Sequence, residues 1–215
     1  MIIDNTWVLN YIKKHGNTII IPKETKIIKS NAFDLNEDIM IRVEFEEGSQ
    51  LETIESFAFR GVKIENTIVL PKNIKRIEEY AFYGLPYSVC LDDYSSIEVC
   101  DSDFIFHGKR KVNVPPNLKK LELSGLIERL ESITIPADSK LEDMQITYGV
   151  DKVILPNSQE LLSTNEKLIC ALRLRENKIM VLYYKGEGLY YEIMNIKDQT
   201  ILYSRNCSFI SKQYI

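Results

Sequence analysis

Two stretches of the chain repeat one phrase, and this self-similarity constrains the fold more than any other feature. Residues 17–33 read NTIIIPKETKIIKSNAF and residues 66–82 read NTIVLPKNIKRIEEYAF. Each has a short apolar segment closed by proline, then spaced isoleucines, then an Ala-Phe pair. Because one such unit cannot bury its apolar side alone, copies must stack on one another. The sequence therefore predicts a solenoid.

Weaker copies extend this pattern along the chain. The residues that close successive strand segments are Pro22, Glu46, Pro71, Asp92, Pro115, Pro136 and Pro156. Their intervals of 24, 25, 21, 23, 21 and 20 residues fall within the roughly 20–29 residues of leucine-rich repeats. We expect an α/β-type but mostly β solenoid of about seven right-handed turns, with a parallel sheet on one face.

Side chains alternate across a strand, so each segment divides into inward and outward residues. The predicted inward pairs are Ile19 and Ile21, Val43 and Phe45, Ile68 and Leu70, Val89 and Leu91, Val112 and Val114, Ile133 and Ile135, and Val153 and Leu155. The residues between each pair face outward and form one column: Ile20, Glu44, Val69, Cys90, Asn113, Thr134 and Ile154. A second outward column is Thr18, Arg42, Thr67, Ser88, Lys111, Ser132 and Lys152. A bound partner would lie on these columns.

The second half of each unit predicts a helical turn or short helix on the convex side. It contains Ile27, Ile54, Ile77 or Leu121, followed by Phe33, Phe59, Phe82, Phe104 or Leu126. Stacked phenylalanine rings would fill that half of the core.

The two ends of the chain differ from the repeats. Residues 1–16 are expected to be an N-terminal cap, a small strand pair carrying Trp7, Leu9, Tyr11 and Ile12. The repeats occupy residues 17–166. Residues 167–215 consist of apolar segments separated by turn clusters, which predicts an antiparallel meander. This segment is either a C-terminal cap or a small domain that depends on the last edge of the solenoid.

Composition excludes several classes of partner. The formal net charge is −4, and basic residues alternate with acidic ones, so nucleic acid is not an expected partner. No apolar run approaches the roughly 20 residues of a membrane-spanning helix. The start of the chain does not resemble a signal peptide, and Cys90, Cys100, Cys170 and Cys207 form no CxxC motif. We therefore expect a cytoplasmic location with reduced thiols.

The sequence offers no constellation typical of catalysis. His15 and His107 are the two histidines, and no HExxH, GxSxG or P-loop motif occurs. The acidic pairs Glu46–Glu47 and Asp92–Asp93 lie where strands end, which favours solvated turns over acid-base chemistry. We expect no catalytic residue, cofactor or metal.

The repeat resembles the BspA-type leucine-rich repeat. The residues that carry the resemblance are Ile68-Val69-Leu70-Pro71, Ile74, Ile77 and Ala81-Phe82, with equivalents around Pro22 and Phe33 and around Leu51, Ile54 and Phe59. The resemblance is strongest over residues 17–104. It implies a non-enzymatic interaction protein, and many members are adhesins exposed on the cell surface.

These observations lead us to expect a protein-interaction module that binds its partner on the outward columns. The alternatives are an adhesin exported without a recognisable leader and an enzyme whose site lies in the tyrosine-rich tail near Tyr184, Tyr191 and Arg205. Apolar outward residues such as Ile20, Val69 and Ile154 would be covered by the caps, by neighbouring protomers or by a partner. Self-association through the solenoid edge or the C-terminal segment stays open.

Overall fold

The computed structural model describes residues 1–35, 39–85, 88–91, 94–100, 109–123, 130–146, 150, 152–154, 166–174, 178–185, 188–195 and 201–206. The chain divides into two compact units, Met1–Ile105 and Phe106–Ile215. This division lies inside the predicted repeat region, whereas the predicted boundaries near residues 16 and 166 remain predictions. Each unit is considered by itself below.

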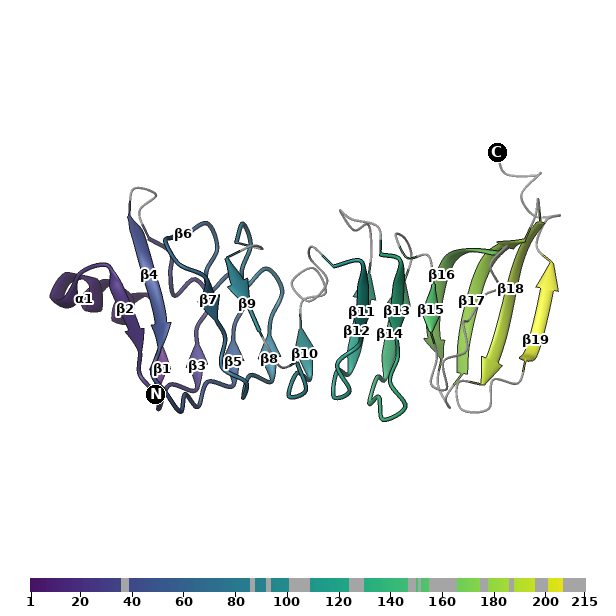
Figure 1. The fold of residues 1–215 in the computed structure, drawn as a ribbon, viewed down its shortest axis with the longest axis horizontal. Helices are drawn as coiled ribbons and strands as arrows, with labels where there is room; N and C mark the ends of the chain where they lie inside the picture. The colour runs from purple at the N-terminus through teal and green to yellow at the C-terminus, as the bar shows by residue number, and fades with distance from the viewer. Residues whose placement is uncertain are drawn as a thin grey trace. The chain divides into compact units, whose positions relative to one another are not determined.

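The N-terminal segment is a strand followed by a helix, so the predicted strand pair was wrong. Strand β1 (Ile2–Ile3) precedes helix α1 (Asn5–His15). The Asp4 carboxylate caps the helix by accepting a hydrogen bond from the Trp7 amide at 2.8 Å, and Gly16 ends it with a positive φ of 80°. Val8 is the buried residue of α1, which packs beside β2 at one end of the first unit (Figure 1).

The first unit contains two ladders of parallel strands (Figure 1). The first ladder consists of β2 (Thr18–Ile21), β4 (Met40–Phe45), β6 (Lys63–Ile64), β7 (Ile68–Val69) and β9 (Val89–Cys90). Ile20 pairs with Glu44, and Val69 pairs with Cys90, as the sequence alignment predicts. The continuous parallel sheet that we predicted is broken, because β2, β4 and β6 form one sheet and β7 and β9 another.

The second ladder replaces the predicted helical turns. It consists of β1, β3 (Ile27–Ile28), β5 (Thr53–Ile54), β8 (Arg76–Ile77) and β10 (Val99–Cys100), joined in one parallel sheet. One carbonyl per turn accepts two amides of the next turn. The Lys26 carbonyl accepts from Glu52 and Thr53, and the Glu52 carbonyl accepts from Lys75 and Arg76. Because these backbone groups bond to the neighbouring turn, they are not available for the bonds within one segment that a helix requires. The segments are therefore extended.

The two ladders enclose a layered apolar core. Every inward residue predicted for the first unit is buried except Phe45, which is half-buried. Phe33, Phe59 and Phe82 stack, with ring centroids 4.1 and 5.1 Å apart, which confirms this part of the predicted aromatic column. Phe104 and Leu126 lie outside the described residues.

The second unit begins with two further turns of the same kind. Its first ladder consists of β11 (Lys111–Asn113), β13 (Ser132–Thr134) and β15 (Val153–Ile154), and its second begins with β12 (Lys120–Leu123) and β14 (Asp143–Ile146). With four turns in the first unit, the described solenoid has six complete turns, and β15 is the first-ladder strand of a seventh turn. The predicted solenoid is therefore confirmed at about this length.

The predicted antiparallel meander is also confirmed. It consists of β16 (Glu166–Leu174), β17 (Lys178–Lys185), β18 (Gly188–Asn195) and β19 (Ile201–Asn206). β14 pairs with β16 in the antiparallel sense, with Ile146 opposite Ala171. The meander therefore continues the second ladder of its own unit, and its dependence on that edge for stability stays a prediction.

Candidate binding surface

The outer face of the first ladder carries the predicted binding columns. In the first unit Thr18, Arg42, Glu44 and Thr67 are exposed, and Ser88 and Cys90 are half-buried. Two large apolar side chains interrupt these polar positions: Ile20 is 40% exposed and Val69 is 54% exposed. The N-terminal cap therefore does not cover Ile20, which was one of the explanations open from the sequence.

An ion pair occupies the middle of this face. Arg42 Nε lies 2.7 Å from Glu44 Oε1, and both side chains point outward from β4. An exposed pair of this kind contributes little to stability. Because the two charges of the pair offset each other, we expect the exposed apolar side chains beside it to contribute more to the binding of a partner.

Met40 belongs to the same face and was missed from the sequence. It is exposed, and it lies on the side of β4 that carries Arg42 and Glu44. The predicted strand segment began at Arg42, whereas β4 begins at Met40 and pairs there with Lys63 of β6. The alternation of Met40, Arg42 and Glu44 with Ile41 and Val43 was the available signal.

Asn66 produces the break in the first ladder. Its side-chain Oδ1 accepts a hydrogen bond from the Val43 amide at 3.0 Å, and its Nδ2 donates to the Val43 carbonyl at 2.9 Å. The side-chain amide thus takes the place of a strand residue beside β4. Nδ2 also lies 3.0 Å from the Thr67 carbonyl, which ties the turn to the start of β7.

In the second unit the predicted columns have fewer exposed groups. Lys111 and Asn113 are exposed, whereas Thr134, Lys152 and Ile154 are half-buried. Ser132 is buried, so it does not form exposed surface as expected. Its short side chain stands opposite the longer Lys111 in the neighbouring strand. The outward columns of this unit are therefore more basic and less apolar than those of the first unit.

The turns after the second ladder hold a series of carboxylates. Glu55 accepts hydrogen bonds from Lys29 Nζ at 2.9 Å and from the Ser30 amide and hydroxyl, and Glu78 repeats this with Ser56. Partial burial raises the pKa of Glu55, but the hydrogen bonds from Lys29 and Ser30 and the Lys29 charge outweigh it, so the pKa is lowered overall. These carboxylates join successive turns.

The described residues show no constellation for metal binding, since no group of three His, Cys, Asp or Glu side chains converges among them. His15 is exposed at the end of α1, and His107 lies outside the described residues. Within the described residues, no helix is both long and apolar enough to span a membrane. Cys90 and Cys100 are half-buried and are not joined in a disulfide, while the side chains of Cys170 and Cys207 are outside the description.

A polar cluster lies among the described residues of the tyrosine-rich tail. The Tyr183 hydroxyl donates to Glu192 Oε1 at 2.9 Å, and the Ser204 hydroxyl lies 3.3 Å from the same oxygen. Tyr183 is buried and stacks on Tyr190, which indicates sheet packing. The side chains of Tyr184, Tyr191 and Arg205, named for the enzymatic alternative, lie outside the described residues.

A solenoid of stacked two-strand turns with an exposed ladder face defines a repeat protein of the leucine-rich class. The model of the BspA type leucine rich repeat region matches six copies over residues 11–124, more than half of the 215 residues. The chain belongs to this family, which is typically non-enzymatic. Neither the characterised proteins nor the solved structures contain a match to it.

Proposed function

We propose that the protein is a non-enzymatic interaction module that binds a protein partner through the outer face of the first ladder. The family supports a role as a repeat module for protein interaction. The observation that carries the proposal is the exposure of Ile20 and Val69 at outward positions, where a solvated face would have polar residues.

The arrangement has the parts of a protein interface. Ile20, Met40 and Val69 supply apolar contact area, and the Arg42–Glu44 pair lies on the same face. Thr18 and Thr67 add polar groups of the kind found at an interface rim. Because these side chains project from hydrogen-bonded strands, little backbone order would be lost on binding.

Binding by the second unit would be more electrostatic. Lys111 and Asn113 are its exposed outward residues, with Thr134, Lys152 and Ile154 partly accessible. Lys111 Nζ lies 3.7 Å from Glu131, and Arg110 lies 3.4 Å from the same residue, so part of this charge is paired. We assign these residues to the same function as secondary contacts.

The test uses a photo-reactive residue in place of Thr67 to capture the partner from an extract of the source cells. The purified partner is then titrated against the native chain and variants. We expect the double substitution Ile20→Ser and Val69→Ser to weaken binding at least about tenfold, because central apolar contacts dominate interface energy. Ile2→Ser is the matched control, since Ile2 is a similarly exposed isoleucine on the second ladder.

Equal affinity of the native chain and the double variant would contradict the proposal. Replacement of Glu44, Val69 and Asn113 together by residues of opposite character extends the test to both units. We also propose a cytoplasmic location, which rests on the sequence alone. Cell fractionation decides between it and the adhesin alternative, and sedimentation of the purified chain decides whether it self-associates.

A further inference from the structure

The turns that follow the second ladder of the first unit repeat two outward positions. The first position holds Asn31, Phe57 and Tyr80 in successive turns, and the second, three residues later, holds Asp34, Arg60 and Tyr83. Amide-to-carbonyl bonds from Phe33 to Ala58 and from Phe59 to Ala81, at 2.9 and 2.8 Å, hold these turns in register. Side chains at equivalent positions therefore stand beside one another.

The first position requires a left-handed backbone. The φ angles are 55° at Asn31, 59° at Phe57 and 59° at Tyr80. Asparagine tolerates this region, but bulky side chains rarely adopt it. The turn geometry therefore does not explain why aromatic residues occupy two of the three positions, and such outliers direct attention to function.

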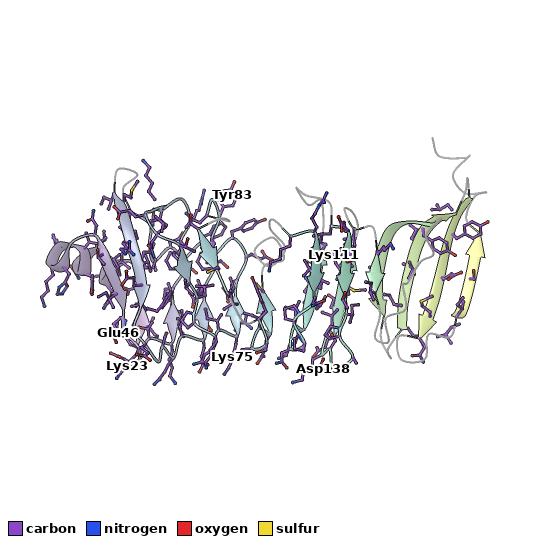
Figure 2. The ribbon with its side chains drawn as sticks, in the orientation of Figure 1. Lys23, Glu46, Lys75, Tyr83, Lys111 and Asp138 are labelled. Atoms are coloured by element: carbon purple, nitrogen blue, oxygen red, sulfur yellow. The ribbon has the colours of Figure 1, made fainter. Side chains whose placement is uncertain are left out.

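The aromatic side chains form an exposed corner. Phe57 and Tyr80 stack with ring centroids 5.3 Å apart, and Tyr83 stands edge-on to Tyr80 at 6.1 Å with an interplanar angle of 74°. Tyr80 is 47% exposed and Tyr83 is 59% exposed. Figure 2 shows Tyr83 at the upper edge of the first unit, on the side away from Lys75. Tyr80 and Tyr83 are thus exposed, whereas the Phe33–Phe59–Phe82 stack is buried.

Arg60 lies over this corner without a carboxylate partner among the residues that the structure describes. Its guanidinium carbon is 5.4 Å from the centroid of the Phe57 ring. In contrast, Arg42, Arg76 and Arg110 each lie within ion-pair distance of a glutamate. A guanidinium held over a ring face can still donate its N–H groups to a carboxylate, because the attraction to the ring does not use them as hydrogen-bond donors to oxygen.

We propose that Phe57, Arg60, Tyr80 and Tyr83 form a second binding surface, which takes a short acidic and apolar segment of a protein partner. A Glu or Asp carboxylate accepts hydrogen bonds from the Arg60 guanidinium, and a neighbouring apolar side chain packs against Tyr80 and Tyr83. Tyrosine and arginine are also the residues enriched at the energetic centres of protein interfaces.

Nearby acidic residues restrict the partner further. Glu79 precedes Tyr80 in the sequence, and Asp34 occupies the position equivalent to Arg60 in the preceding turn. Both are exposed. Their charges disfavour a long run of carboxylates or a polyanion such as nucleic acid. The expected ligand therefore has one or two carboxylates followed by an apolar residue.

The proposal is tested by nuclear magnetic resonance titration of the full chain with a capped peptide, Gly-Ser-Glu-Phe-Ser-Gly. The signals to follow are the Arg60 Nε–H and the Tyr83 ring. We expect saturable shifts of both with this peptide, and at least tenfold weaker binding of the peptide with Gln in place of Glu. Arg60→Gln should weaken binding of the Glu peptide at least tenfold, and Tyr83→Ala should weaken it several-fold.

Arg76→Gln is the matched control, since Arg76 is an exposed arginine of the same unit that already lies 3.6 Å from Glu78. It should leave peptide binding unchanged, as should the double substitution Ile20→Ser and Val69→Ser. The amide spectrum of each variant verifies its fold. Absence of saturable shifts, equal binding of the Glu and Gln peptides, or unchanged binding by a folded Arg60→Gln variant would each overturn the proposal.

Discussion

The two ladders of the first unit arise from the same turns but differ in regularity. The second ladder runs through β1, β3, β5, β8 and β10 as one sheet. Equivalent residues of successive turns pair with one another at every step, without a shift in register. The first ladder breaks between β6 and β7 and exposes apolar residues outward. The second ladder is therefore the regular part of the repeat. The first ladder differs from turn to turn, both in its strand pairing and in the side chains that it exposes.

The largest loss of stability is expected when the aromatic ring at the centre of the core is removed. Phe59 is fully buried between Phe33 and Phe82, so Phe59→Ala should lower the free energy of unfolding by about 3–5 kcal/mol. Urea denaturation monitored by the fluorescence of Trp7, the one tryptophan of the chain, reports on the first unit. Val69→Ala on the outer face should change the same quantity by no more than about 0.5 kcal/mol. Similar losses for both would remove the distinction.

The next effect concerns the break itself. Asn66→Ala removes the two hydrogen bonds to Val43 and leaves backbone groups without partners. We expect a loss of about 1–3 kcal/mol. Asn17→Ala is the matched control, because Asn17 occupies the same place in the repeated phrase and is exposed. Asn66→Asp retains the acceptor but loses the donor, so an unchanged stability of this variant would contradict the assigned role of the amide.

One substitution in the second half of the first turn is expected to stabilise the fold. Thr25 is fully buried, and its hydroxyl finds no hydrogen-bond partner in the described structure. Equivalent turns have Leu51, Ile74, Ile97, Leu118 or Leu141 at this position, all buried. Thr25→Val should therefore raise the stability of the first unit by about 1 kcal/mol, since it removes an unsatisfied polar group. Thr18→Val, at an exposed position, should have no comparable effect.

The smallest expected effect depends on pH. The pKa of Glu55 is lowered in the folded state, so its carboxylate stabilises the fold above the unfolded-state pKa of about 4.3. This contribution is lost as the pH falls through the folded-state pKa. Glu55→Gln should be less stable than the native chain at pH 7 by under about 1 kcal/mol, and the difference should vanish in acid. A difference between the native chain and Glu55→Gln that stays the same from pH 7 to acid would contradict this account.

The parts that could be predicted from sequence follow from simple periodicity. Alternation across short strands identified Ile19, Ile21 and Ile68 as buried, because the core requires one side of every strand to be apolar. A solenoid of about seven turns and an antiparallel tail were predicted from the repeat interval and the turn clusters, and the described solenoid has six complete turns. The two-residue strands of the second ladder were interpreted as helical turns, since so short a segment shows no period.

Other features could not be read in this way, or their signals were overlooked. Helix α1 had a capping aspartate, Asp4, and a terminal glycine, Gly16, but the alternation of Trp7, Leu9 and Tyr11 suggested a strand. The role of Asn66 depends on a backbone partner more than 20 residues away, Val43, and no local pattern encodes it. The Arg60–Phe57 contact depends likewise on the left-handed turn that directs both side chains outward.

The doubly accepting carbonyls of the second ladder carry a further consequence for how this chain can change in length. The carbonyls of Lys26, Glu52, Lys75 and Lys119 accept backbone amides of the following turn, so these bonds use only backbone atoms and do not depend on the side chains, which are three lysines and one glutamate. Removal of the turn between Lys26 and Glu52 would present the amides of Lys75 and Arg76 to the Lys26 carbonyl in the same geometry. Gene duplication or deletion can therefore lengthen or shorten this solenoid by whole turns. Each event places exposed side chains next to those of a different turn.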